Sequence, residues 1–263
     1  MATVIELTDD EWDLVKDLFD PKGRRGMPAR YSRREMVDAL LFMARTGIQW
    51  RYLPDRYPPW SAVWQQWRRW RANGVWARAM VLLAHAVRIL KKRPSVQPSM
   101  VMIDAQVVRG GRFGPTFHNA GGRGGRTIGA KRSIVIEILG LPVAVRVDPA
   151  QPHDVKVGRE LLKDEITGNR LPRLGAIVAD RGYQGLSRLA AHHNLRLDIK
   201  KPPKGASGFT PIAPLYRVEN AFARLGRWRR LSRCYEGSKE SAKAWLEVAA
   251  VAYMFALIRA EPT

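Results

Sequence analysis

Residues 101–108 read VMIDAQVV, an apolar, β-prone run that carries one aspartate, Asp104. The nearest acidic residues along the chain are Asp55 and Glu137, whereas arginine and lysine are common on both sides. A short apolar run of this kind predicts a buried strand. Because an unpaired buried carboxylate is costly, Asp104 is expected to meet a cation in the folded protein.

The sequence after residue 100 alternates between strand and helix patterns. RSIVIEILGLPVAVRVD (132–148) predicts two strands joined at Gly140-Leu141, a typical hairpin pattern. AIVAD (176–180) and LRLDIK (195–200) predict two further strands, so that five strands are expected in all. Helical patterns follow or separate these strands, at about 151–170, 184–194, 213–230 and 239–259.

The first ninety or so residues predict helices only. Thr8 with Glu11, and Ser32 with Glu35, fit the capping box, in which two side chains satisfy the free amides of a helix start. The expected helices cover about 9–19, from Ser32 to about Thr46, 60–72 and 75–92. Because RPSVQPS (93–99) has the composition of a linker, we expect a helical domain at 1–93 and an α/β domain at 94–263.

The third expected helix is rich in tryptophan and arginine. Its apolar residues recur at helical spacing and predict a small helical core, formed by Trp60, Val63, Trp64, Trp67 and Trp70. Arg68, Arg69 and Arg71 fall mostly on another side, and no acidic residue occurs from 56 to 103. These arginines are therefore candidates for contact with phosphates.

The composition is strongly basic. Lysine and arginine number 45 against 24 aspartates and glutamates, which gives a formal net charge of +21. Such a charge indicates a polyanionic partner, because neutralising phosphates releases counterions. A membrane partner would need a basic amphipathic helix, which the sequence does not indicate, and we expect the apolar run from Val248 to Ile258 to be a buried helix too short to span a bilayer.

Cysteine usage and the N-terminal sequence point to the cytoplasm. Cys234 is the single cysteine, so an internal disulfide is excluded and a cysteine-based zinc site is not expected. The first twelve residues, MATVIELTDDEW, contain acids and no apolar segment of the length that a signal peptide has. We therefore expect a cytoplasmic protein.

Two further carboxylates have settings that resemble that of Asp104. Asp180 ends an apolar strand and begins a glycine-rich turn, and Glu219 lies at the inner edge of the apolar stripe of a basic helix. Magnesium ions are bound by a few carboxylates together with water and substrate phosphate, and two such ions can clamp the oxygens of a displacement at phosphorus. The alternative is that the aspartates are turn or cap residues and the glutamate is salt-bridged, with Glu236 as the reserve candidate for a third carboxylate.

A glycine- and arginine-rich segment lies between the first two expected strands. Residues 109–130, RGGRFGPTFHNAGGRGGRTIGA, contain eight glycines and four arginines. The segment is interpreted either as a mobile basic loop that becomes ordered on DNA or as an irregular surface insertion.

The sequence resembles the DDE transposases of bacterial insertion sequences, specifically insertion sequence family five. In the first domain the resemblance rests on LTDDEWDLVKDLF, REMVDALLFMARTGIQWRYLPDRYPPWSAVWQQWRRW and GVW. In the second it rests on MIDAQVV, KRSIVIEILGLPVAV, ADRGYQG and RVENAFARLGRWRRLSRCYE. The order of elements, with acids on the first strand, the fourth strand and a late helix, is that of the ribonuclease H-like nucleases.

The resemblance implies a fold, a metal and a substrate. It implies a helical DNA-binding domain followed by a ribonuclease H-like domain with a mixed five-stranded sheet, and Asp104, Asp180 and Glu219 as catalytic, metal-binding residues. Two Mg²⁺ ions, with Mn²⁺ as a substitute, would support cleavage of double-stranded DNA at the transposon ends and strand transfer into target DNA, by a homodimer or higher oligomer. The residues expected to contact DNA are Arg68, Arg69, Arg71, Arg109, Arg112, Lys131, Arg217, Arg224, Arg227 and Arg230.

Three alternatives remain open at the level of sequence. One is a ribonuclease H-like nuclease that cuts DNA without joining it. Another is a DNA-binding regulator derived from a transposase, without chemistry. A third is a recombinase with Tyr235 or Tyr183 as nucleophile, which would form a covalent adduct with DNA.

Overall fold

The structure is a computed structural model that describes residues 6–21, 29–111, 117–201 and 213–260. The chain forms two compact units. The first comprises the described residues of Met1–Arg93, Leu225–Arg233 and Glu240–Thr263, and the second those of Pro94–Arg224 and Cys234–Lys239. The change of unit after Arg93 coincides with the expected boundary, whereas most of 225–263, which we expected in the second domain, belongs to the first unit.

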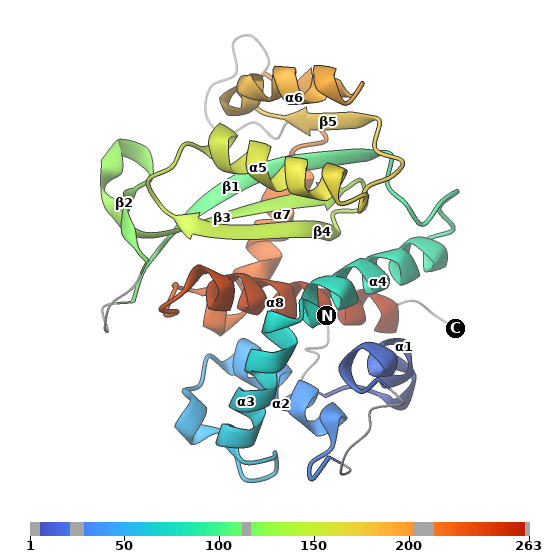
Figure 1. Ribbon diagram of the computed structural model, residues 1–263, viewed down its shortest axis with the longest axis vertical. Coiled ribbons are helices and arrows are strands. Elements are labelled where there is room, and N and C mark those ends of the chain that lie inside the picture. The colour runs from blue at the N-terminus through green and yellow to red at the C-terminus, as the bar shows by residue number, and fades with distance from the viewer. Residues whose placement is uncertain (1–5, 22–28, 112–116, 202–212, 261–263) are drawn as a thin grey trace. The chain divides into compact units, whose positions relative to one another are not determined.

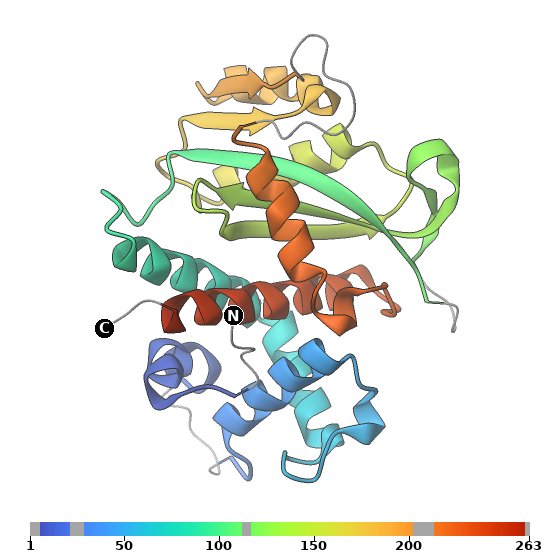
Figure 2. The same cartoon turned by 180° about the vertical axis from the view of Figure 1, so that it is seen from behind.

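The first unit is helical, as the sequence predicts (Figures 1 and 2). Its elements are α1 (Asp9–Phe19), α2 (Arg33–Thr46), the 3₁₀ turn η1 (Trp50–Tyr52), α3 (Trp60–Ala72), α4 (Val75–Leu90), η4 (Arg229–Leu231) and α8 (Lys239–Arg259).

The predicted helix caps form in the structure. The Thr8 hydroxyl accepts from the backbone N–H of Glu11, whose side chain accepts from the N–H of Thr8, so the capping box is complete. The Ser32 hydroxyl accepts from the N–H of Glu35. Gly47 ends α2 with a φ of 71°, in the left-handed region that favours glycine.

Aromatic side chains form the core of the first unit. The Phe19 ring meets Trp70 and Trp76 edge-on, with centroids 5.0 and 4.7 Å apart, and the Trp67 ring lies 4.6 Å from that of Trp245 on α8. The predicted tryptophan core is only partly correct, because Trp60 and Trp64 are exposed, along with Arg68 on the same helix.

α8 belongs to the first unit because it is apolar around its whole circumference and needs partners on every side. Its residues from Ser241 to Phe255 are almost all buried. The helix is long and apolar enough to cross a membrane, but 72% of its most apolar window is buried inside the protein, as in a core helix. The expectation of a buried helix is thus confirmed, and the bounds of α8 agree with the expected helix at about 239–259.

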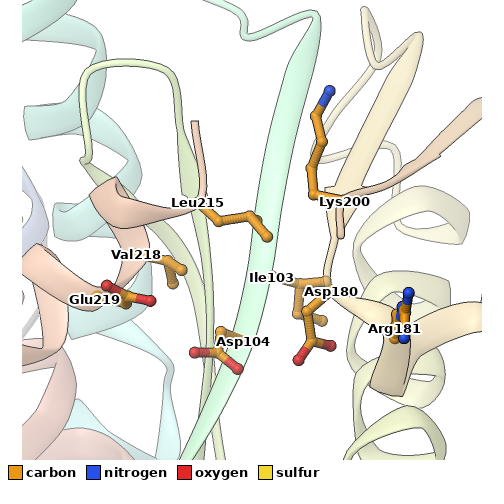
Figure 3. Close-up of a pocket in the computed structure, with 8 residues that line it drawn as sticks. All are labelled: Ile103, Asp104, Asp180, Arg181, Lys200, Leu215, Val218 and Glu219. Carbon is orange, nitrogen blue, oxygen red and sulfur yellow. The ribbon is translucent and has the colours of Figure 1, made fainter. Parts of the chain in front are cut away.

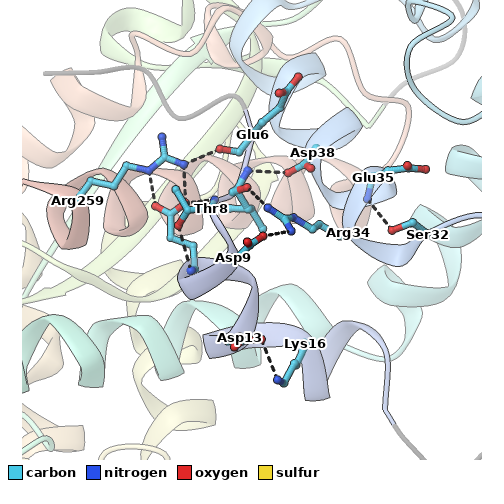
Figure 4. A network of polar contacts seen from close by, with 12 residues as sticks. Glu6, Thr8, Asp9, Asp13, Lys16, Ser32, Arg34, Glu35, Asp38 and Arg259 are labelled. Carbon is cyan, nitrogen blue, oxygen red and sulfur yellow. Dashed lines mark hydrogen bonds and ion pairs between the residues drawn. The ribbon is translucent and has the colours of Figure 1, made fainter.

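A polar network ties the end of α8 to the start of the chain (Figure 4). The Arg259 guanidinium donates to the Glu11 carboxylate over 2.6 Å and to the backbone oxygen of Glu6. Asp38 on α2 accepts from the N–H of Leu7 at 2.9 Å, and Arg34 donates to Asp9. These contacts hold the residues that precede α1 against α2 and α8.

The second unit is a mixed sheet with helices. Its strands are β1 (Met100–Arg109), β2 (Asn119–Gly121), β3 (Thr127–Glu137), β4 (Pro142–Pro149), β5 (Ala176–Ala179) and β6 (Arg196–Ile199). Its helices are α5 (Asp154–Thr167), α6 (Ser187–His192) and α7 (Tyr216–Leu225), with 3₁₀ turns η2 (Arg123–Gly125) and η3 (Arg181–Leu186).

The described sheet has six strands, in the order β2-β3-β1-β5-β6 with β4 paired to β3. β1 is antiparallel to β3 and parallel to β5, so it lies at the change of direction. The sheet differs from the expected five strands by β2, which forms within the glycine- and arginine-rich segment because three of its residues pair with β3. The sequence of this segment did not predict a strand, because it is rich in glycine and has no alternating apolar residues.

Helices cover both faces of this sheet. α5 lies across the face seen in Figure 1, and α7 crosses the opposite face, which is seen in Figure 2. The core under α5 includes Val101 and Ile103 of β1, Leu161 and Leu162 of α5, and Tyr183 of η3. The hairpin between β3 and β4 turns at Gly140, whose φ of 82° requires a residue without a β-carbon.

Candidate functional site: a carboxylate pocket in the second unit

Asp104 and Asp180 are brought together by the pairing of two parallel strands. Met102 of β1 is the register partner of Val178 of β5. Asp104 lies two residues after Met102, and Asp180 lies two residues after Val178. If this register is continued, the two aspartates therefore lie side by side. The strand pattern around VMIDAQVV therefore places one carboxylate beside the carboxyl end of the neighbouring strand, where open α/β sheets present reactive groups.

Asp180 also serves as a cap, as the simpler interpretation of its sequence predicted. It follows directly after β5, and its Oδ1 accepts from the N–H of Gly182 at 2.9 Å. The side chain is nevertheless exposed, so it can take part in binding as well as in capping. Asp104 is half-buried, and its Oδ1 accepts from the N–H of Ala105 at 2.8 Å.

Glu219 reaches the same place from α7. The buried residues Leu215 and Val218 face the sheet, and Glu219 lies next to them. Its side chain is exposed, whereas the sequence suggested the core side of the helix. The difference follows from position, because Glu219 lies at the margin of the apolar stripe, where a charged group can remain in water.

One pocket of about 350 Å³ collects these side chains within the second unit. Figure 3 shows Asp104 between Glu219 and Asp180, with the ammonium of Lys200 directed away from the carboxylates. Glu219, and not the reserve candidate Glu236, lines this pocket in the described part of the chain. The full lining is Ile103, Asp104, Asp180, Arg181, Lys200, Leu215, Val218 and Glu219.

The surroundings of Asp104 disfavour the ionised form of its carboxyl group. Burial raises the pKa of its carboxyl to about 7, and the charges of Asp180, Asp154 and Glu219 add to the rise, while the N–H of Ala105 opposes it. Among the described residues, no lysine or arginine forms an ion pair with Asp104. A cation in the pocket would therefore favour the ionised form of Asp104.

The three carboxylates are of the type that binds a hard divalent cation, but they lie too far apart in this structure to surround one ion. Carboxylate oxygens are the ligands that Mg²⁺ prefers, and the pocket offers three such groups. Within the ranges that the structure describes, however, no three histidine, cysteine, aspartate or glutamate side chains are grouped closely enough to hold a metal ion. The three carboxylates thus share a pocket without forming a ready coordination shell, which is consistent with mutual repulsion of like charges.

The residues expected to contact DNA have different surroundings. Arg68, Arg69, Arg109, Arg224 and Arg227 are exposed, Arg71 and Arg217 are half-buried, and Arg112 lies outside the described residues. Arg230 donates to the backbone oxygen of Ile48 at 3.2 Å and lies 4.7 Å from the ring centroid of Trp245.

Lys131 differs most from expectation. It is buried, and its ammonium lies 2.5 Å from the carboxylate of Asp154, with a further hydrogen bond to the backbone oxygen of Pro152. β3 accounts for this, because the strand is buried on both faces from Gly129 to Glu137, and Arg132 and Ser133 are buried as well. An ammonium in this position is held by the protein itself rather than presented to a phosphate.

Sequence reasoning missed two cations at the site and the burial of Tyr183, which it considered only as a possible nucleophile. Arg181 and Lys200 line the pocket. Lys200 follows β6 directly, and its N–H donates to the backbone oxygen of Ala179 at 2.9 Å, so the register of two parallel strands was the signal that could have found it. Tyr183 is 1% exposed, and its hydroxyl has no hydrogen-bond partner in the described chain. Nothing in its local sequence indicated this.

A mixed sheet with three carboxylates around one pocket, together with a unit of helices, is the arrangement expected of a DDE-type transposase. Two family models match this chain. One, described as "Putative transposase of IS4/5 family (DUF4096)", matches residues 7–80, and one described as "Transposase DDE domain" matches residues 96–212. The chain belongs to the DDE transposases of insertion sequences.

Two relatives support the assignment. The chain is 35% identical over 124 residues to the uncharacterized protein y4sN of Sinorhizobium fredii (strain NBRC 101917 / NGR234), in a match that covers 46% of this chain and 87% of the relative. It is 34% identical over 110 residues to the insertion element IS402 uncharacterized 16.2 kDa protein of Burkholderia cepacia, covering 39% of this chain and 73% of the relative. No solved structure matches the chain.

Proposed function

We propose that this protein binds the terminal repeats of an insertion sequence and catalyses metal-dependent DNA strand cleavage and strand transfer. The observation that carries the proposal is the shared pocket of Asp104, Asp180 and Glu219, which come from β1, the end of β5 and α7. The mixed sheet, with β1 at its centre and helices on both faces, supports a ribonuclease H-like fold for the second unit.

The three carboxylates of Asp104, Asp180 and Glu219 would hold two divalent ions, and Asp104 is the carboxylate that lies between the other two. Magnesium, or manganese in its place, would supply Lewis-acid activation of the attacking oxygen and of the scissile phosphate. Asp104 suits the central position because Figure 3 shows it between the other two carboxylates. Because the pKa of its carboxyl is raised to about 7, binding of a cation would favour the loss of its proton.

The basic side chains would hold the DNA while the carboxylates act. Arg68, Arg69, Arg109, Arg224 and Arg227 are exposed, and the formal net charge is +21. Each phosphate that these side chains neutralise releases counterions, so affinity should fall steeply as salt rises. Joining two ends in one reaction calls for two active sites, so we propose that the protein acts as a dimer or higher oligomer on double-stranded DNA, in the bacterial cytoplasm and at the nucleoid.

The central test separates chemistry from binding. Asp180→Asn should nearly abolish Mg²⁺-dependent cleavage of an element end, while the gel-shift affinity for the same DNA stays within about twofold, because phosphate contacts supply that affinity. Asp164→Asn on α5 is the matched control, since Asp164 is an exposed acid that does not line the pocket. Cleavage by Asp180→Asn at the wild-type rate would refute the proposal.

A second measurement separates transposition from simple hydrolysis. Precut ends that carry a free 3′-hydroxyl should be joined to a target plasmid by the wild-type protein with Mg²⁺. Cleavage without any joining would instead identify a nuclease, and DNA binding without either activity would identify a regulator.

A further inference from the structure

Helix α3 has a buried face and an exposed face, and both carry tryptophan. Val63, Trp67 and Trp70 are at most 3% exposed and belong to the core of the first unit. Trp60 and Trp64 are each 38% exposed. The two exposed residues are four positions apart, so they lie on the same side of the helix, about one turn from each other.

An arginine covers each of the exposed indoles. The Arg51 guanidinium lies 5.8 Å from the ring centroid of Trp60, and that of Arg68 lies 4.8 Å from the centroid of Trp64. In the described ranges of the chain, neither arginine forms an ion pair. We call these four residues, Arg51, Trp60, Trp64 and Arg68, the tryptophan–arginine face.

The stability of the unit does not account for this face. A cation–π contact at an exposed site contributes less to stability than burial of an indole would. Two large rings remain partly in water on a helix whose opposite side already supplies the core. A pair of exposed indoles flanked by cations therefore indicates a ligand that is both anionic and flat.

The charge of the surroundings selects the ligand. Asp55 is the nearest acid along the sequence, and no acidic residue follows until Asp104, whereas Arg69 and Arg71 lie on the same helix. A nucleic acid strand supplies both complements, because its phosphates attract guanidinium groups and its bases stack on aromatic rings.

We propose that the tryptophan–arginine face binds unpaired DNA bases. Trp60 and Trp64 stack on the bases, and Arg51 and Arg68 leave the rings to contact the flanking phosphates. The inference rests on the proposed function, which makes DNA the partner, and it adds that this face binds DNA in an unpaired state. Inside a duplex both faces of every base are already stacked, so these indoles can reach only bases that are unpaired or extruded.

The spacing of Trp60 and Trp64 along the helix supports a splayed strand. Four residues of α-helix rise about 6 Å, whereas stacked bases in one strand are about 3.4 Å apart. A strand that contacts both indoles must therefore have its bases pulled apart, which a single strand allows at lower cost than a duplex.

The test compares two states of one DNA sequence. Fluorescence anisotropy of the full-length protein is measured with a labelled single-stranded oligonucleotide and with its duplex. Trp60→Ala combined with Trp64→Ala should weaken single-strand binding about tenfold or more, while duplex binding changes by less than about twofold. Trp60→Phe combined with Trp64→Phe should retain most single-strand binding, because phenylalanine still stacks, and this pair guards against a mere folding defect.

Arg69→Ala is the matched control on the same helix, because Arg69 is exposed and lies next to Arg68 without covering a ring. It should weaken both complexes by a similar factor. Three outcomes would overturn the inference while the proposed function stands. The double alanine variant could bind single strands as the wild type does, it could lose affinity for both DNA forms equally, or sedimentation could show that its oligomeric state has changed. If the wild-type protein binds neither DNA form, both this inference and the proposed function are wrong.

Discussion

The ammonium of Lys131 lies 2.5 Å from the carboxylate of Asp154, and the lysine side chain is 6% exposed while the aspartate side chain is 47% exposed. The pair joins β3 to the first residue of α5. Asp154 in turn is one of the acids whose charge raises the pKa of Asp104. Lys131 therefore binds a carboxylate whose charge influences Asp104.

The first prediction concerns this pair. Lys131→Met should lower the free energy of unfolding by about 1–3 kcal/mol, because Asp154 loses a buried partner but remains partly in water. The salt dependence of DNA binding should stay the same, since a lysine held inside the protein neutralises no phosphate. Denaturant unfolding and anisotropy at several salt concentrations measure the two effects. A shallower salt slope would show that Lys131 contacts DNA after all.

The second prediction concerns pH and the charge of Asp104. The folded-state pKa of about 7 lies above the ordinary value of 3.8, so between these pH values the folded protein keeps a proton that the unfolded chain has released. Stability should therefore fall as pH rises through this window, by a total on the order of 4 kcal/mol at most. Asp104→Asn should remove this pH dependence and raise the melting temperature at pH 8 in the absence of metal.

Divalent cations supply the companion measurement. At pH 8, Mg²⁺ should raise the melting temperature of the wild-type protein, because a cation in the pocket stabilises the ionised carboxylates of the folded state. The same addition should have little effect on Asp104→Asn. Asp164→Asn, outside the pocket, should respond to pH and to Mg²⁺ as the wild type does, and equal responses of all three proteins would contradict the placement of the cation.

The third prediction concerns the hydroxyl of Tyr183. The side chain is 1% exposed and its oxygen has no hydrogen-bond partner among the described residues, which is unfavourable for a buried donor. Tyr183→Phe should therefore be neutral or stabilise the fold by about 1 kcal/mol in chemical denaturation. A loss of more than about 1 kcal/mol would indicate that the hydroxyl has a partner in solution.

The fourth prediction uses two glycines of the first unit. Gly47 and Gly74 both have positive φ, of 71° and 61°. A β-carbon at Gly47 would lie 3.1 Å from the β-carbon and 3.2 Å from the carbonyl carbon of Arg229, whereas at Gly74 it would meet only the end of the Arg78 side chain at 3.9 Å. Gly47→Ala should therefore destabilise the protein by about 1 kcal/mol more than Gly74→Ala, as measured by urea unfolding.

Much of the fold could be predicted from local sequence. The bounds of α1 and α3 follow from a capping box and from a run of helical spacing, and the β3–β4 hairpin follows from a glycine between two apolar runs. These features depend on residues that are near one another in the chain. The presence of Asp104 and Asp180 in one pocket could be expected from the resemblance of the sequence to a known family, but its physical cause is the register of β1 and β5.

The remaining features depend on distant residues. The exposure of Trp60 and Trp64 is decided by what the rest of the unit leaves uncovered, so helical spacing alone could not separate them from Trp67 and Trp70. The burial of Lys131 depends on Asp154, and the open spacing of the three carboxylates depends on charges that lie 39 or more positions apart. β2 pairs with β3 although its three residues are asparagine, alanine and glycine.

The discontinuity of the first unit has a practical consequence. A cut at residue 93 would leave the helical half without α8 and would leave the sheet half carrying an apolar helix that has lost its partners. Each half made separately should aggregate, whereas a fusion of 1–93 to 225–263 through a flexible linker should fold. α7 crosses from the second unit to the first at Arg224 and Leu225, so the helix that bears Glu219 is shared by the two units along the chain. A boundary placed at 224–225 would therefore cut the helix that carries the third carboxylate of the pocket.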